Sequence, residues 1–336
     1  EIAQACGYNS EESFAKAFRR EFGTGPAAVR RREPASTILE TLAVHGGSGT
    51  STKILYEPLE ANRLRLAGEA MFIDVREAVQ DTRGHIPGAV NLPELFYNHS
   101  TSTPEGLSEM ESDLARLFER AGVAGDRTVL FYEEDLDSQY GASCRGYFQL
   151  SYLGHPNAGV LSGGLNRWRR EGFPVDQTPG SGRPGHWKAA PNREGLATVD
   201  DVLNAVEHQQ IKLLDNRDKD EWLGINCAPP AYYDEAFLPR KGRIPGARWI
   251  EWRKFLEDDN GCKRFKSPEQ IRSICAQAGL YPDDDIIIYC FKGARAANTQ
   301  VAMKLAGFKR VRNYYGSWNE WSRDAALPAM ASRLFA

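Results

Sequence analysis

The chain has 336 residues, of which 41% are hydrophobic and 26% are charged, as expected for a soluble globular protein with two or three domains. Its formal net charge of −3 gives no overall argument for nucleic-acid or membrane binding, and no stretch approaches the roughly 18 apolar residues of a membrane-spanning helix. The six cysteines form neither a CxxC pair nor a zinc spacing, so we expect reduced thiols, a cytoplasmic location and no metal or other cofactor.

Residues 1–34 have the pattern of short helices joined by turns. Ser10 is a favourable N-cap, and three phenylalanines, Phe14, Phe18 and Phe22, follow on one helical face. The order Gly-Tyr-x-Ser-x-x-Ser-Phe-x-x-Ala-Phe-x-x-x-Phe-Gly-x-x-Pro closely resembles the second helix-turn-helix of AraC-type transcription regulators. We therefore expect a short all-α segment here, a partial AraC-like helix-turn-helix.

This resemblance covers only the last part of that family's DNA-binding domain, because the first helix-turn-helix is absent. Residues 10–32 carry six Lys or Arg against three Glu, so we expect residues 1–32 to bind DNA weakly, without sequence preference and only at low salt. The alternative is a fused remnant that binds no DNA. The sequence shows no signal peptide. Because the chain begins with Glu1 rather than Met, we expect its natural N-terminus to be missing. Residues 35–52 are expected to form a linker.

Beyond the linker the chain repeats itself. Five motifs occur twice in the same order, offset by roughly 140–160 residues. The pairs are 71–76 and 212–217, 84–89 and 242–247, Ser108–Ala121 and Ser267–Ala278, 129–132 and 286–289, and 163–168 and 316–321. Because short apolar strands alternate with capped helices, we expect two α/β domains with parallel sheets covered by helices on both faces. Their predicted bounds are 53–178 and 195–330, with a Gly- and Pro-rich linker at 179–194.

In the second copy a cysteine stands where a strand ends and a helix begins. The run Ile286–Tyr289 predicts a buried parallel strand, and Cys290 follows it directly. Lys292 and Arg295 add positive charge before the predicted helix. Backbone N–H groups and the helix dipole favour the thiolate, the nucleophilic form of cysteine, at such a position. The alternative is that Cys290 is a small buried hydrophobic residue.

The spacing between Cys290 and Arg295 distinguishes two chemistries. Phosphatases with a cysteine nucleophile hold phosphate in a loop that is one residue longer than residues 291–294. The smaller loop suits one sulfur atom carried on Cys290 better than a phosphoryl group. No histidine lies close to Cys290 in the sequence, which gives little support to a cysteine protease.

The repeated motifs resemble the tandem-domain rhodaneses over about residues 53–330. They are Asp-x-Arg after a strand, Gly-x-Ile-Pro-Gly-Ala, the strand-Cys-loop-helix, and Gly-Ser-Trp-x-Glu-Trp. The resemblance implies two rhodanese-like domains, of which the first is inactive and the second catalytic. The first copy has Glu133, Glu134 and Asp135 after its strand, and these acids would repel an anionic donor. Its nearest cysteine, Cys144, is expected to serve packing in the following helix.

The resemblance further implies a thiosulfate sulfurtransferase without a cofactor. Cys290 would attack the outer sulfur of thiosulfate, sulfite would leave, and the persulfide would pass its sulfur to a thiophilic acceptor, cyanide or a thiol. The implied substrate-binding residues are Arg217, Lys292, Arg295, Phe291, Gly293 and Ala294. Two of them have alternatives, because Arg217 could serve only as an ion-pair partner of Asp215 and Arg295 could hold the shape of the loop.

Two other functions remain open. Thiosulfate-preferring members of the family have basic residues after the cysteine, whereas members that prefer 3-mercaptopyruvate have Gly and Ser there. Phe291 and Lys292 match the thiosulfate pattern in part, so a 3-mercaptopyruvate sulfurtransferase is one alternative. The other is a sulfur-sensing DNA-binding regulator that uses the N-terminal segment.

Overall fold

The computed structural model describes residues 53–178, 180, 185, 187–229 and 240–330, together with six single positions between residues 10 and 19. The helix-turn-helix predicted for residues 1–34 and the linker predicted for residues 35–52 therefore lie outside the described residues, apart from those six positions.

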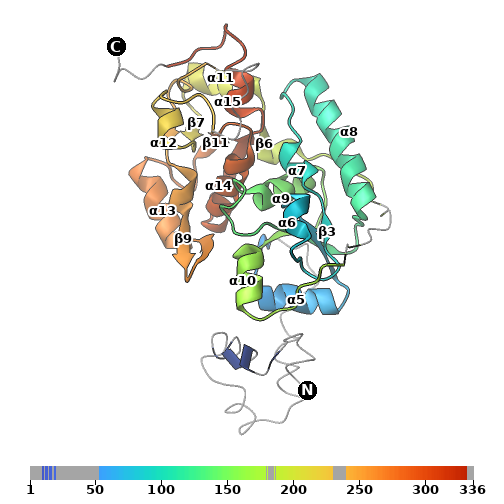
Figure 1. Cartoon of the computed structure of the whole chain (residues 1–336). Coiled ribbons are helices and arrows are strands. Elements are labelled where there is room, and N and C mark those ends of the chain that lie inside the picture. The colour runs from blue at the N-terminus through green and yellow to red at the C-terminus, as the bar shows by residue number, and fades with distance from the viewer. Residues whose placement is uncertain are drawn as a thin grey trace.

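Two five-stranded parallel sheets form the framework of the molecule (Figure 1). The first has the strand order β1-β5-β4-β2-β3 and the second β6-β12-β11-β7-β8. The strands are β1 (Leu55–Tyr56), β2 (Ala70–Asp74), β3 (Val90–Asn91), β4 (Thr128–Tyr132), β5 (Ala158–Leu161), β6 (Leu196–Ala197), β7 (Lys212–Asp215), β8 (Arg248–Trp249), β11 (Asp285–Tyr289) and β12 (Arg310–Tyr314). An antiparallel pair, β9 (Leu256–Asp259) and β10 (Cys262–Phe265), is present only in the second domain within the described residues. Matching strands occupy matching places, which confirms two α/β domains of one topology.

Helices cover both sheets. In the first domain they are α5 (Pro58–Leu66), α6 (Ala78–Asp81), α7 (Glu94–Tyr97), α8 (Pro104–Ala121), α9 (Ala142–Tyr152) and α10 (Gly164–Arg170). In the second they are α11 (Val199–His208), α12 (Lys219–Trp222), α13 (Pro268–Gln277), α14 (Ala294–Leu305) and α15 (Ser317–Trp321), with 3-10 turns at Arg193–Gly195 and Trp252–Phe255.

The two sheets share one hydrophobic core. Side chains alternate between the faces of a strand, so Ile286 and Ile288 of β11 enter a different cluster from Ile287. The cluster with Ile286 and Ile288 also contains Val129 and Phe131 of β4 in the first domain. The helices α9 and α14 lie between the two sheets and pack against each other (Figure 1). The domains are therefore joined through buried apolar surface.

A glycine allows α9 and α14 to approach closely. Gly141 precedes α9 with φ of 77°, and a Cβ at this position would lie 2.7 Å from the Cβ of Asn298 on α14. Any larger residue would be strained by its backbone conformation and would also push the helices apart.

The matching helices α13 and α8 begin differently, and only the start of α13 agrees with the sequence prediction. Ser267 and Gln270 form the predicted capping box of α13, with Gln270 N–H donating to Ser267 Oγ at 3.3 Å. The prediction that Ser108 begins the matching helix is wrong. α8 begins at Pro104, and its N-cap Thr103 accepts the Gly106 N–H at 3.2 Å, because Pro is well suited to the first helical turn.

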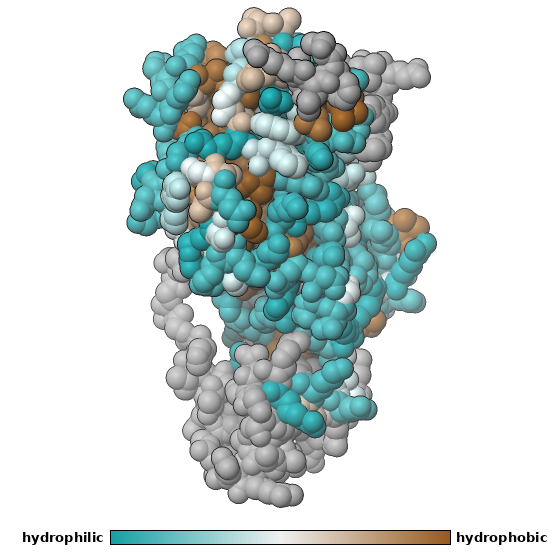
Figure 2. Space-filling view, turned by 90° about the vertical axis from the view of Figure 1, so that its left-hand side faces the viewer, coloured by the Kyte–Doolittle hydropathy of each residue, from teal (hydrophilic) through white to brown (hydrophobic). Residues whose placement is uncertain are grey.

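Figure 2 shows that hydrophilic residues cover most of one face of the described part of the molecule, where hydrophobic residues form small patches. None of the helices in the described residues is both long enough and apolar enough to cross a membrane.

Candidate active site

Cys290 lies at the carboxyl end of β11, in a tight turn before α14. Its side chain is almost fully buried, with 1% exposed. Gly293, the N-cap of α14, has φ of 81° and donates its N–H to Cys290 Sγ at 3.0 Å. The sulfur therefore receives a backbone N–H at the positive end of a helix of 12 residues, an arrangement that stabilises negative charge on sulfur.

The start of α15 fixes the backbone of the cysteine loop. Trp318 and Asn319 donate their N–H groups to the carbonyl oxygens of Cys290 and Phe291, each at 3.0 Å. Ser317 Oγ accepts the Cys290 N–H at 3.1 Å and donates to Tyr314 O at 2.7 Å. The Gly-Ser-Trp motif therefore serves to hold the backbone of the cysteine loop, a role that its sequence pattern alone does not reveal.

Gly293 is required by space as well as by its backbone conformation. A Cβ there would lie 2.9 Å from Tyr315 O, and Asn313 Nδ2 donates to Gly293 O at 3.0 Å. The neighbouring Ala294 is also buried. Small residues at these two positions let the loop close tightly around the sulfur.

Arg145, from α9 of the first domain, holds the cysteine loop of the second. Its Nη1 donates to the carbonyl oxygen of Lys292, and its guanidinium lies 4.4 Å from the ring centre of Tyr315. Further donations go to Tyr315 Oη at 2.7 Å and to Leu95 O at 3.2 Å. The sequence analysis missed this residue. Its only sequence signal is an arginine within a helix whose neighbouring positions are apolar or small.

The loop mouth is basic. Lys292 is half-buried, with Nζ lying 5.8 Å from the ring centre of Phe291, which is itself buried. Burial lowers the pKa of Lys292, and repulsion from Arg145 and Arg323 lowers it further. His99 of the first domain is bonded through Nε2 to Asn319 Oδ1 at 2.8 Å, and burial together with Arg145 lowers its pKa to about 4.

Arg295 is buried in an ion pair beneath the loop. Its Nη1 and Nη2 bind the two carboxylate oxygens of Glu221 at 2.5 and 3.0 Å, and only 2% of the residue is exposed. Burial opposes the charge, but Glu221 outweighs it, so the pKa of Arg295 is raised. The neighbouring Cys290 contributes less to this rise in the pKa of Arg295 than Glu221 does.

Arg217 is fully buried beside the end of the neighbouring strand β7. It binds Asp215 through Nε and Nη2, the shortest contact being 2.6 Å, and donates to Gly242 O at 2.8 Å. Its guanidinium lies 4.7 Å from the ring centre of Trp318. Its third nitrogen, Nη1, is buried and has no hydrogen-bond partner among the residues that the structure describes. Arg217 is thus positioned by an ion pair, with one donor to spare.

The first domain repeats this framework but fills the site with carboxylates. Glu133 takes the place of Cys290 after β4 and accepts N–H bonds from Ser143 at 3.0 Å and Gln139 at 2.9 Å. Glu134 pairs with Arg76 at 2.6 Å and so occupies the donor that stays unpaired in Arg217. Cys144 is fully buried in α9, where burial raises its pKa well above the usual value, so it serves packing as expected.

Metal ligation finds no support among the described side chains, where no group of three or more His, Cys, Asp or Glu residues could hold an ion.

The geometry agrees with comparisons to known proteins. The rhodanese-like domain family matches the chain twice, at residues 51–171 and 198–324. The sulfur carrier protein TtuD of Thermus thermophilus is 32% identical over 283 residues, covering 83% of this chain and 94% of that protein. The thiosulfate sulfurtransferase of Rattus norvegicus is 31% identical over 242 residues, covering 72% of this chain and 78% of that protein.

Solved structures show the same fold. YnjE aligns with a TM-score of 0.68 at 23% identity, covering 83% of this chain and 68% of YnjE. The wild-type structure of EanB aligns with a TM-score of 0.66 at 22% identity, covering 89% of this chain and 69% of EanB. With a family match over both domains and relatives above 30% identity, the chain belongs to the rhodanese-like family of sulfurtransferases.

Proposed function

We propose that this protein is a thiosulfate sulfurtransferase that carries the transferred sulfur as a persulfide on Cys290. The observation that supports this most directly is the N–H of Gly293, which lies 3.0 Å from Cys290 Sγ at the N-terminus of α14. A donor in that place stabilises a thiolate before reaction and a persulfide anion after it.

The reaction is a double displacement. The Cys290 thiolate attacks the outer sulfur of thiosulfate, so a new S–S bond forms while the old one breaks, and sulfite leaves with the electron pair. A thiophilic nucleophile then attacks the outer sulfur of the persulfide. Cyanide gives thiocyanate and a thiolate gives a new persulfide, and the Cys290 thiolate is regenerated in both cases.

The basic mouth suits an anionic donor. Thiosulfate carries two negative charges on a compact anion, which a lysine ammonium can meet with several donors. We assign this contact to Lys292, with the loop N–H groups of Gly293 and Ala294 facing the sulfur and Phe291 narrowing the approach. His99 and Arg145 add positive or polar groups from the first domain.

The two buried arginines support the site from below. The ion pairs of Arg295 with Glu221 and of Arg217 with Asp215 favour the alternative roles stated for them, those of positioning residues. Nη1 of Arg217, which has no partner within residues 187–229 and 240–330, could still donate to a bound anion.

Mass spectrometry tests the proposal. After exposure to thiosulfate, the peptide containing Cys290 should gain the mass of one sulfur atom, and cyanide should remove it. Cys290→Ser should lose thiosulfate:cyanide transfer by several orders of magnitude while keeping its fold, because the hydroxyl ionises far less readily. Cys144→Ser is the matched control. An active Cys290→Ser protein beside an inactive Cys144→Ser protein would refute the assignment.

Phe291 carries no charge, so the proposed preference for an anionic donor depends on Lys292. We infer a higher kcat/KM for thiosulfate than for 3-mercaptopyruvate, since the carboxylate of the latter is better met by a bidentate arginine than by a lysine. Steady-state kinetics with both donors decides between them, and a preference for 3-mercaptopyruvate would reverse the assignment.

A further inference from the structure

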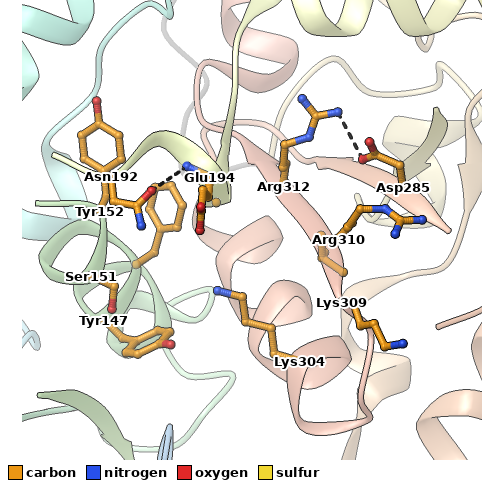
Figure 3. A pocket seen from close by; sticks show the side chains of 13 residues that line it. Tyr147, Ser151, Tyr152, Asn192, Glu194, Asp285, Lys304, Lys309, Arg310 and Arg312 are labelled. Atoms are coloured by element: carbon orange, nitrogen blue, oxygen red, sulfur yellow. Dashed lines mark hydrogen bonds and ion pairs between the residues drawn. The ribbon is translucent and has the colours of Figure 1, made fainter. Parts of the chain in front are cut away.

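A cavity of about 460 Å³ opens between the two domains (Figure 3) and is lined by Asp285 at the start of β11, the strand that ends before Cys290. Its walls come from α9, from the 3-10 turn Arg193–Gly195 between the domains, and from the start of β11 and the end of α14. Ten residues separate Ala294 from Lys304 in α14, so the cavity lies roughly 15 Å along the helix axis from the cysteine loop. Its volume is within the usual range for small-molecule sites.

The two domains contribute different chemistry to this cavity. The first domain supplies an aromatic wall, formed by Tyr147, Phe148 and Tyr152 of α9. The second supplies cations, Lys304 among them, from α14 and β12. A ligand with an apolar ring and an anionic group would find a partner on each side.

Three of the charged side chains that line the cavity, Asp285, Lys309 and Arg312, already form ion pairs. Arg312 binds Asp285 and Asp201, each at 3.1 Å, and Lys309 binds Asp283 at 3.0 Å. Lys304 is different. Within the described part of the chain, no hydrogen bond or ion pair involves its Nζ.

Lys304 extends into the cavity. Figure 3 shows its side chain reaching from α14 toward the aromatic wall and Glu194, with Nζ inside the cavity. The residue is half-buried, and burial lowers the pKa of its ammonium group. A half-buried cation without a partner is costly, and an anion placed beside it would offset that cost.

We propose that this cavity binds a small organic anion, with its carboxylate or phosphate group at Lys304 and its planar apolar part against Tyr147 and Phe148. The site is separate from the sulfur-transfer site and does not depend on the function proposed for Cys290.

Titration calorimetry on the full chain tests the proposal with three probes: phenyl phosphate, benzoate and inorganic phosphate. Phenyl phosphate and benzoate distinguish the two sources of negative charge, and the tighter of them identifies the anionic group. Inorganic phosphate measures the contribution of the aromatic wall, because it carries charge without a ring, and we expect it to bind at least several-fold more weakly than phenyl phosphate.

Four variants locate the site. Lys304→Gln should weaken phenyl phosphate binding about tenfold or more through loss of a charge-assisted contact, whereas Lys304→Arg should retain it and shows that the site folds. Lys309→Gln is the matched control at the cavity rim, and Lys292→Ala is the control at the cysteine loop. Both should bind phenyl phosphate as the wild type does.

The proposal would be overturned by the absence of binding by both aromatic probes, by equal affinity in the Lys304→Gln and wild-type proteins, or by equal affinity for inorganic and phenyl phosphate. Loss of binding in Lys292→Ala with retention in Lys304→Gln would also refute it, since the probe would then occupy the sulfur-transfer site.

Discussion

At the scale of single residues, the cations around Cys290 differ in whether they are buried in ion pairs or lie at the mouth of the cysteine loop. Arg295 and Arg217 have carboxylate partners and are buried, so their charges hold the loop and the strand ends in place. Lys292 sits at the mouth, where burial and two nearby arginines lower its pKa. If the donor is thiosulfate, as proposed, its two negative charges would relieve that repulsion, and we therefore expect the charge of Lys292 to contribute strongly to donor affinity.

Lys292→Ala should therefore raise the KM for thiosulfate by roughly tenfold or more, the effect of losing one charge-assisted contact worth about 1.5–3 kcal/mol. Steady-state kinetics measures this, with the exposed Lys254→Ala as control. An unchanged KM in the Lys292 variant would mean that the lysine does not contact the donor.

Glu133, the counterpart of Cys290, gives stability a dependence on pH. Burial raises its pKa to about 7 from a model-compound value of 4.5, although bonds from Ser143 and Gln139 oppose the rise. The folded state thus binds this proton more strongly than the unfolded state does. Its stabilising contribution is complete below about pH 4.5 and is lost as the pH rises toward 7.

We expect the free energy of unfolding to lose up to about 3 kcal/mol through this window relative to Glu133→Gln, which cannot ionise. Urea denaturation of both proteins between about pH 5 and pH 8 measures the difference in slope. Parallel pH profiles would show that Glu133 does not titrate there.

At the scale of secondary structure, each half of the site is built by a strand end and the helix that follows it. β11, the cysteine loop and α14 were predictable because a β-branched apolar run, a glycine and a helical pattern occur in direct succession. The start of α8 was not, because Thr103-Pro104 and Ser108 both carry helix-start signals, and the structure uses the first pair. The role of α9 could not be predicted either, since Arg145 acts on a loop 147 residues away.

Arg145→Ala should lower kcat by about tenfold or more with a smaller change in KM, because the loop would lose the donor to Lys292 O that fixes its shape. Arg145→Lys should recover little, since an ammonium group cannot reach all the acceptors that the planar guanidinium spans. Kinetics on both variants, with the exposed Arg116→Ala as control, tests this. Equal kcat values in Arg145→Ala and the wild type would show that the contact between Arg145 and the cysteine loop is dispensable.

At the scale of the whole molecule, the two domains are repeats in sequence but a single unit in packing. One cluster of buried side chains includes strands of both sheets and the facing helices α9 and α14. Sequence repetition predicted two α/β domains of one fold with parallel sheets. It could not predict their joint core, because the pattern of an apolar helix face does not reveal which partner covers it.

The shared core predicts one unfolding transition. Calorimetry should give a single peak whose calorimetric and van't Hoff enthalpies agree, and fluorescence and circular dichroism should report the same midpoint. Residues 187–330 expressed alone should bind a hydrophobic dye, since α14 would lose its cover. Two separated transitions would show that the domains unfold independently.

The hydrogen bond from Arg145 to the cysteine loop also limits which substitutions the first domain can accept. A copy that has lost its nucleophile is ordinarily free to accumulate substitutions or to be deleted. Here the copy with Glu133 supplies the donor that holds the Lys292 carbonyl and the helix that covers α14. The exposed surface of the first domain can vary, but the face that packs against the second domain must remain compatible with it. If the function proposed for Cys290 holds, we expect chimeras that exchange only one half to be inactive unless the matching face of α9 is transferred as well.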